Sequence, residues 1–313
     1  MNFNKNSKIY IAGHNGMVGS AIYNLLKKKK YNNILTVPRK DLDLINQKKT
    51  ENFLKKTKPN FVIIAAAKVG GILINQKNKA DFIYQNLTIQ NNLIHSSYKA
   101  GVKKLIFLGS SCIYPKFASQ PLKEKYLLNG ILEETNDAYS IAKISGIKMC
   151  EAYNQQHGLN YISLMPTNLY GPNDNYNLDT SHFFPALLSK IYYAKKNKLR
   201  EIVIWGNGKP KRELMHVEDL ANACEFFLKK KTKHNLINIG SGIEKTISEY
   251  AKFIMQKIGV KLKIKYDLEK PNGTPRKLLD TNLAKTYGWK SKINLDKGFD
   301  LTLKNFLKKK YKK

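Results

Sequence analysis

Three polar side chains could act together on a carbonyl group. Tyr139 and Lys143 are four residues apart in a segment with a helical pattern, so both are expected on one helical face. A free tyrosine has a pKa of roughly 10, and a nearby ammonium group is expected to lower it. Ser110 follows the apolar run 104–108 and can donate a hydrogen bond to a carbonyl oxygen. Such a set would polarise a carbonyl for hydride attack and supply the proton.

A glycine-rich turn follows the first apolar run and opens a helical pattern. It reads Gly13-His14-Asn15-Gly16-Met17-Val18-Gly19. Glycine permits a tight turn and a close approach of the backbone to a pyrophosphate, which then lies at the positive end of the helix. This spacing is weak evidence alone, but its place between a strand and a helix makes it more specific. The turn predicts a dinucleotide-binding site.

The second expected strand ends near a cation. Arg39 stands where an acidic residue would accept the ribose 2′-hydroxyl of NAD. A cation there accommodates a 2′-phosphate, so the sequence favours NADP (NADPH) as cofactor. The alternative is that Arg39 is an ordinary surface cation and Asp41 reaches the ribose.

Strand-like and helix-like segments alternate in the first half of the chain. Strands are expected at residues 8–12, 34–37, 61–65, 104–108 and 161–165, and long helices at 81–100 and 137–156. This alternation predicts an α/β fold, with a Rossmann-type doubly wound parallel sheet covered by helices on both faces. Open parallel sheets bind ligands at the carboxyl ends of their strands, which is where the glycine turn and Ser110 lie.

After Tyr170-Gly171-Pro172 the pattern changes to shorter strands and a polar loop. We expect residues 1–170 to form the cofactor-binding domain, with later segments returning to it. Residues 171–313 are expected to form mainly a smaller substrate-binding lobe. The lysine-rich end, 308–313, is expected to be frayed.

Composition excludes several classes of protein. The chain of 313 residues has a formal charge of +32, but nearly all of its cations are lysines without a basic recognition element, so nucleic-acid binding is not expected. No run of about 18 apolar residues suggests a membrane span. Three widely spaced cysteines offer neither a metal site nor a disulfide framework. They indicate a reduced, cytoplasmic compartment and no metal.

Several motifs resemble those of the extended short-chain dehydrogenase/reductase family. The shared signature is the glycine turn, the serine at the strand end and Tyr139-x-x-x-Lys143. Within that family the chain is similar to the GDP-L-fucose synthases over nearly its whole length. The stretches that carry this similarity are Ala65-Ala66-Ala67-Lys68-Val69-Gly70-Gly71-Ile72, Leu108-Gly109-Ser110-Ser111-Cys112-Ile113-Tyr114-Pro115, Pro166-Thr167-Asn168-Leu169-Tyr170-Gly171-Pro172 and Gly273-Thr274-Pro275-Arg276-Lys277.

The resemblance implies 3,5-epimerisation and NADPH-dependent 4-reduction of GDP-4-keto-6-deoxy-D-mannose to GDP-L-fucose. Cys112 resembles the base of that family and His182 its acid, beside Ser110, Tyr139 and Lys143. The residues implied at the cofactor are Gly13, Asn15, Gly16, Met17, Val18, Gly19, Arg39, Leu108, Gly109, Ser110, Ser111, Lys143, Pro166, Thr167, Asn168, Leu169 and His182, with Asn86 nearby. The residues implied at the GDP-sugar are Lys190, Trp205, Arg212, Asn272 and Lys277, with Arg276 a weaker candidate. A homodimer through helices 81–100 and 137–156 is also implied.

Three positions depart from the pattern of the family. Asn15 replaces an arginine found in many relatives, which leaves Arg39 to select NADP. Lys190 replaces an arginine, and Asn272 stands where an aspartate is common.

Other functions stay open at this point. The chain could be another extended dehydrogenase acting on a nucleotide sugar, such as a 4-epimerase, a 4-reductase or a 4,6-dehydratase. Dehydratases usually place an acidic residue after the serine, where this chain has Cys112. It could also be a catalytically silent nucleotide sensor, although a sensor would need only the glycine turn.

Overall fold

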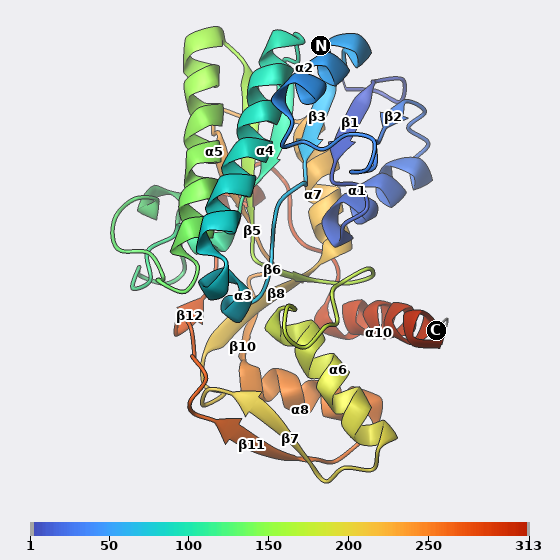
Figure 1. Ribbon diagram of the computed structural model, residues 1–313, viewed down its shortest axis with the longest axis vertical. Helices are drawn as coiled ribbons and strands as arrows, with labels where there is room; N and C mark the ends of the chain where they lie inside the picture. Colours follow the sequence, from blue (N-terminus) through green and yellow to red (C-terminus); the bar gives the residue numbers. More distant parts are fainter. Residues whose placement is uncertain (1–2, 312–313) are drawn as a thin grey trace.

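The computed structural model describes residues 3–311, and a six-stranded sheet forms the upper part of the molecule in Figure 1. Its strand order is β2-β1-β3-β4-β5-β9, and every neighbouring pair is parallel. The strands are β1 (Ile9–Ala12), β2 (Ile34–Leu35), β3 (Phe61–Ile64), β4 (Lys104–Leu108), β5 (Asn160–Pro166) and β9 (Leu236–Ile239). The reversal of order between β1 and β3 is that of a doubly wound fold, so the predicted fold class is confirmed.

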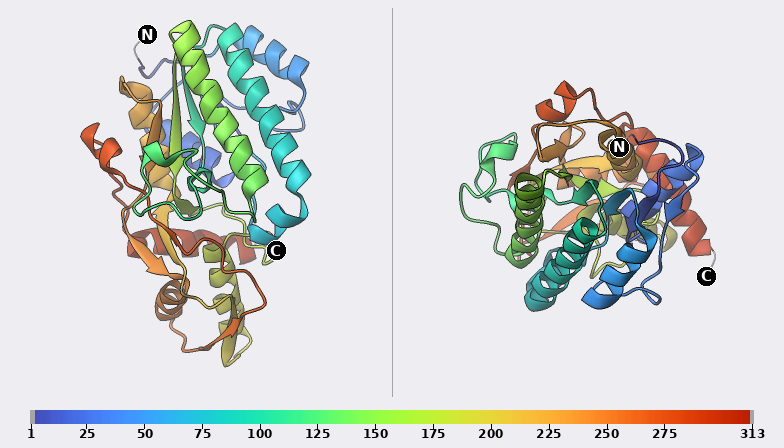
Figure 2. Two further views of the ribbon diagram at one scale, coloured as in Figure 1. Left: turned by 90° about the vertical axis from the view of Figure 1, so that its left-hand side faces the viewer. Right: turned by 90° about the horizontal axis from the view of Figure 1, so that it is seen from above.

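Helices cover both faces of this sheet. Figure 2 shows α2 (Gln47–Thr57), α4 (Lys79–Lys99) and α5 (Asp137–His157) as one layer. The other face carries α1 (Met17–Lys28) and α7 (Val217–Lys229), which pack on each other. Side chains alternate across a strand, and β1 accordingly divides its buried residues between the two cores. Ile9 and Ile11 pack with α1 and α7, whereas Tyr10 and Ala12 pack towards α2, α4 and α5.

A second, smaller lobe is built around β8 (Lys211–His216), below the sheet in Figure 1. This strand pairs in parallel with β6 (Asn168–Tyr170) and β12 (Arg276–Lys277) and antiparallel with β10 (Glu244–Thr246). A separate two-stranded sheet joins β7 (Glu201–Trp205) to β11 (Lys263–Asp267). A third core lies between helices α6 (Phe183–Lys196), α8 (Ile247–Ile258) and α10 (Leu295–Tyr311).

Short elements complete the chain, and several expected boundaries differ from the structure by one or two residues. The short helices are α3 (Ile72–Lys77), η1 (Ser111–Ile113), η2 (Glu124–Tyr126) and α9 (Asn282–Thr286). The second strand stops at Leu35 instead of Val37, and Pro38 cannot donate a further hydrogen bond to the sheet because it lacks an amide donor. Helix α10 continues to Tyr311 where fraying was expected, since its apolar residues pack into the third core. Lys312 and Lys313 lie outside the described residues.

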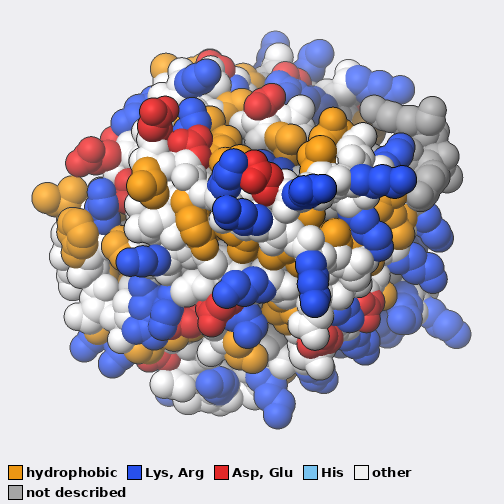
Figure 3. Space-filling model, turned by 90° about the horizontal axis from the view of Figure 1, so that it is seen from below, with side chains coloured by type: hydrophobic (Ala, Val, Ile, Leu, Met, Phe, Trp, Pro, Cys, Tyr) orange, Lys and Arg blue, Asp and Glu red, His pale blue; other side chains and the backbone are white. Residues whose placement is uncertain are grey.

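Charge is spread over the surface. On the face seen from below in Figure 3, Lys and Arg side chains lie among acidic, apolar and uncharged groups. Within residues 3–311, no helix combines the length and apolar character needed to cross a membrane.

A buried carboxylate joins the two lobes. Glu213 of β8 is 0% exposed, and its carboxylate accepts hydrogen bonds from the amides of Gly242 (2.7 Å) and Leu279 (2.9 Å). The side chains of Thr167 and Asn168, next to β5 and in β6, donate to its main-chain carbonyl. Burial raises the pKa of Glu213, and the hydrogen bonds from the amides of Leu279 and Gly242 oppose the rise. One residue thus fixes segments from both lobes.

Glu213→Ala should lower the free energy of unfolding by about 2–6 kcal/mol, because two buried amides lose their acceptor at about 1–3 kcal/mol each. Urea denaturation measures this loss. The control is Glu201→Ala, which removes an exposed ion pair with Lys265 (2.7 Å) and should cost less than about 1 kcal/mol. Equal losses in the two variants would contradict the role given to Glu213.

Candidate active site

The glycine turn between β1 and α1 is shaped for close contact. Gly13 has a left-handed φ of +86°, and a Cβ there would lie 2.7 Å from the Cα of Ala66. A Cβ on Gly19 would lie 2.2 Å from the carbonyl oxygen of Gly13. Gly16 occupies the N-cap of α1 and has no side chain to accept from the first amides of the helix. With no acid in the first turn, this helix end fits a pyrophosphate. Asn15, Met17 and Val18 lie in the same turn.

Arg39 lies in the loop after β2, which pairs with β1. Its side chain is 75% exposed, and its guanidinium is 3.7 Å from the carboxylate of Asp43. Such an exposed ion pair contributes little stability, so the guanidinium can turn to another anion at low cost.

The end of β4 brings Ser110 and Cys112 together. Their Oγ and Sγ atoms are 2.9 Å apart, and either atom can donate. Ser110 precedes the single turn of η1, and Cys112 is 6% exposed within it. Gly109 allows this turn to approach β5, because a Cβ there would lie 2.1 Å from the methyl carbon of Met165. The thiol is thus held against the serine hydroxyl by the shape of the strand end.

Lys143 of α5 is buried beside the same strand end. Its Nζ donates to the carbonyl of Leu108 at 2.8 Å and lies 5.8 Å from the centre of the Tyr139 ring. Burial lowers the pKa of Lys143 to about 8, although the Cys112 side chain opposes the change.

The expected effect of Lys143 on Tyr139 is wrong. Burial raises the pKa of Tyr139, the nearby Cys112 side chain raises it further, and a hydrogen bond with Ser110 opposes both. The ammonium of Lys143 is directed at a main-chain carbonyl instead of the phenol. Tyr139 therefore holds a proton at neutral pH, which is the form that a proton donor needs.

The second lobe contributes a histidine and a lysine to this site. His182 is the N-cap residue of α6, and its side chain keeps contact with solvent. Desolvation by the surrounding protein, together with the positive charge of Lys277, lowers the pKa of His182. Burial also lowers the pKa of Lys277. The nearby Arg212 lowers this pKa further, whereas the Cys112 side chain opposes the change. Lys277 thus interacts with both Cys112 and His182.

Candidates for the GDP-sugar form a connected surface. Lys277 of β12 is paired in register with Arg212 of β8. Arg212 is 9% exposed, and burial lowers its pKa to about 10, which still leaves it charged. An Nη2 atom of Arg212 donates to the carbonyl of Asn272 at 3.5 Å. Of the other two candidates, Lys190 and Trp205 contact each other, with the ammonium of Lys190 5.3 Å from the ring centre of Trp205.

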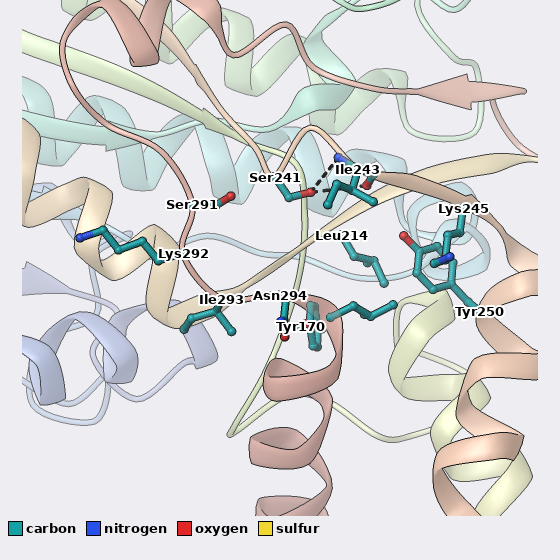
Figure 4. Close-up of a pocket in the computed structure, with 11 residues that line it drawn as sticks. Tyr170, Leu214, Ser241, Ile243, Lys245, Tyr250, Ser291, Lys292, Ile293 and Asn294 are labelled. Carbon is teal, nitrogen blue, oxygen red and sulfur yellow. Dashed lines mark hydrogen bonds between the residues drawn. The ribbon is translucent and has the colours of Figure 1, made fainter.

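A cavity of about 210 Å³ adjoins the Arg212 surface, lined by Asn207, Lys209, Pro210, Asn272, Gly273 and Pro275. A larger cavity of about 260 Å³ lies elsewhere, between Tyr170, Tyr250 and residues 291–295 (Figure 4). None of its lining residues is a candidate catalytic residue, so we assign the chemistry to the Tyr139 cluster.

Two of the implied residues have structural partners. Asn86 is buried and bonds to both the amide (2.9 Å) and the carbonyl (3.0 Å) of Lys68. Arg276 forms an ion pair with Glu244 at 2.8 Å, so its guanidinium is already engaged.

The segment 166–169 runs from the end of β5 into β6 and so joins the sheet to β8. It consists of Pro166, Thr167, Asn168 and Leu169.

Sequence reasoning missed Glu133. This residue is 5% exposed and lies in the loop before α5. Its carboxylate accepts from the hydroxyl of Thr274 (3.3 Å) and pairs with Lys116 (3.5 Å). It also raises the pKa values of Arg212 and Lys277, and so stabilises their charged forms. The sequence signal that could have found Glu133 is that acidic residues are few in this basic chain.

Comparison with known proteins identifies the family. Residues 9–240 match the model of the NAD dependent epimerase/dehydratase family. The chain is 51% identical over 304 residues to GDP-L-fucose synthase 1 of Arabidopsis thaliana, covering 97% of this chain and 94% of that one. It is 45% identical over 309 residues to GDP-L-fucose synthase of Escherichia coli strain K12, covering 96% of each.

Among solved structures, a GDP-mannoheptose C4 reductase from Campylobacter jejuni with NADP bound matches with a TM-score of 0.89. The two are 37% identical, over 98% of this chain and 100% of that one. With the glycine turn and the Ser110, Tyr139 and Lys143 cluster in place, the chain belongs to the GDP-L-fucose synthase branch of the NAD dependent epimerase/dehydratase family.

Proposed function

We propose that the chain converts GDP-4-keto-6-deoxy-D-mannose to GDP-L-fucose by 3,5-epimerisation followed by NADPH-dependent 4-reduction. The observation that carries this proposal is the pairing of two sets of groups. The set at the sheet edge suits reduction of a ketone, while Cys112 and His182 both interact electrostatically with Lys277 and suit proton exchange. Identity of 51% to a GDP-L-fucose synthase supports the choice of substrate.

NADPH is the proposed cofactor, and it would supply the hydride for C4. The glycine turn and the end of α1 are suited to its pyrophosphate. Arg39 has the charge and exposure to bind a 2′-phosphate. The NADP bound to the Campylobacter reductase supports this choice.

For reduction, Tyr139 and Ser110 act on the C4 oxygen. Both would donate hydrogen bonds to it, which draws electron density from the carbonyl carbon. Tyr139 then gives its proton to the oxygen as the C–O double bond becomes a single bond. Lys143, whose ammonium donates to the carbonyl of Leu108 and lies 5.8 Å from the centre of the Tyr139 ring, would hold α5 and the end of β4 in place around the phenol.

For epimerisation, the C4 ketone acidifies the protons on C3 and C5. The Cys112 thiolate would remove one of these protons, and the electron pair of the C–H bond would move into the ketone as an enolate. A proton from His182 on the opposite face would restore the C–H bond with inverted configuration. Cysteine and histidine side chains are both groups that can take part in such proton transfer.

The nucleotide would lie on the surface that joins the lobes. Arg212 offers a forked donor to phosphate, with Lys277 beside it and Asn272 bordering the adjacent cavity. Lys190 and Trp205 form the remaining contact surface. We accordingly assign cofactor binding to residues 1–170 and the segments that return to the sheet, and substrate binding mainly to 171–313.

We propose a cytoplasmic homodimer that pairs through α4 and α5. Exposed Tyr84 and Ile141, at 62% and 46%, lie on these helices. The three cysteines are buried and free, which suits a reducing compartment.

A second candidate is a C4 reductase without epimerisation. The similarity to the Campylobacter GDP-mannoheptose C4 reductase favours it. The two candidates differ in whether Cys112 and His182 exchange protons with the ring.

Tyr139→Phe should reduce turnover by roughly 10²- to 10⁴-fold, the usual contribution of a general acid. The affinity for NADPH should be nearly unchanged, because only the phenol is lost. NADPH oxidation and fluorescence titration measure the two quantities. Near-normal turnover would show that Tyr139 is not the proton donor.

Arg39→Ala should weaken NADPH binding by about 1.5–3 kcal/mol, the contribution of a charged hydrogen bond, and leave NADH binding almost unchanged. The neighbouring Lys40→Ala is the matched control, since Lys40 is also exposed. Titration of each variant with both cofactors decides the point. Equal losses for NADPH and NADH would assign 2′-phosphate recognition elsewhere.

Cys112→Ser should slow exchange of the substrate C3 and C5 protons with deuterated water, because a serine hydroxyl is too weakly acidic to act as the base. His182→Asn should slow it as well, and both variants should still bind NADPH. Mass spectrometry of the recovered sugar measures the incorporated deuterium. Wild-type exchange in both variants would leave the simple reductase as the function.

A further inference from the structure

The segment 68–72, singled out by its sequence, crosses from the sheet to the second lobe. It contains Gly71, the N-cap residue of α3, whose amide donates to the carbonyl of Thr180 at 3.0 Å. Figure 1 shows α3 at the junction of the lobes, just above the start of α6. Thr180 is two residues before His182. The proposed catalytic acid is therefore next to a main-chain contact with the cofactor domain.

A glycine is required at position 71 because there is no room for a side chain, and not because of the backbone conformation. Its φ of −67° and ψ of 177° are open to any residue. A Cβ on Gly71, however, would lie 2.6 Å from the carbonyl oxygen of Ser181. Even alanine would force the 180–182 segment away, because that neighbour is backbone and cannot rotate aside.

Both sides of this contact are anchored. The side-chain amide of Asn75, which is 6% exposed, donates to the carbonyls of Gly70 (2.8 Å) and Gly71 (3.0 Å). On the other side, the carbonyl of His182 accepts from the amide of Ala186 in the first turn of α6. A shift at Gly71 would therefore pass directly to the N-cap of α6.

The contact depends on main-chain atoms. The buried Oγ of Ser181 has no hydrogen-bond partner among residues 3–311. Alignment of His182 with the sheet edge thus rests on the approach of Gly71 and its hydrogen bond to Thr180.

We propose that Gly71 is a positioning residue for proton transfer, which sets the place of His182 relative to Cys112 across the two lobes. This inference rests on the proposed epimerisation, because it gives Gly71 no role in hydride transfer. Gly71 acts only through His182.

The test is deuterium exchange at C3 and C5 in Gly71→Ala. Exchange should fall by roughly 10- to 100-fold, since a displacement of about 1 Å can cost about 100-fold, while NADPH affinity stays unchanged. In a His182→Asn background the same substitution should cause no further loss, which a general structural defect would not reproduce. Ser181→Ala is the control and should exchange at the wild-type rate, because it removes only the unpartnered hydroxyl.

A second measurement does not depend on turnover. Displacement of His182 from the surrounding protein and from Lys277 should raise the pKa of its imidazole towards the ordinary 6.5, as followed by NMR titration. If Gly71→Ala does not fold, Asn75→Ala loosens the same anchor. It should also reduce exchange only when His182 is present.

The outcomes separate the two proposals. Normal exchange in Gly71→Ala together with impaired exchange in His182→Asn would overturn the role of Gly71 alone. A loss that adds to that of His182→Asn would also overturn it. Normal exchange in His182→Asn itself would overturn the proposed acid, and the role of Gly71 with it.

Discussion

The buried carboxylate of Glu213 is the constraint on which the arrangement of the two lobes depends. An ionised or protonated carboxyl group at 0% exposure is tolerated only when its oxygens are hydrogen-bonded. Those bonds come from Gly242, just after the last strand of the sheet, and from Leu279, just after β12. They fix the register in which Lys277 lies beside Arg212. The side chains of Arg212 and Lys277, which we propose to bind the substrate, are thus placed by a carboxyl group that has no contact with solvent.

The two kinds of chemistry depend on different parts of the fold. Ser110, Tyr139 and Lys143 all belong to the sheet edge and α5, so the reduction that we propose depends on one layer of the fold. The proton exchange that we propose pairs Cys112 from that layer with His182 from the second lobe. Its geometry therefore depends on contacts between lobes. An enzyme built this way can lose epimerisation while its reductase set stays intact, which gives a physical route from one activity to the other.

Local patterns in the sequence predicted much of the sheet and its cofactor turn. Strand 104–108 matches the structure at both ends, because its apolar run is a local signal. Strand β8 and its partners were not predicted, since their pairing joins distant segments with little periodicity. Tyr139 and Lys143 could be paired from their spacing, but the direction of the tyrosine pKa could not. The direction of this pKa is decided by burial, and burial depends on residues that are distant in the sequence. Glu133 was not predicted because its partner Thr274 is also distant in the sequence.

The strand pairing around β8 also has a consequence for synthesis of the chain. Its partners are drawn from residues 168–277, so the second lobe cannot close until most of the polypeptide has been made. The first five strands of the sheet follow one another in βαβ units and can assemble earlier. Until β9 arrives, β5 is an unpaired edge, and such edges invite association between nascent chains. The net charge of +32 makes neighbouring chains repel one another during that interval, so the lysine-rich surface would protect a slow folding step.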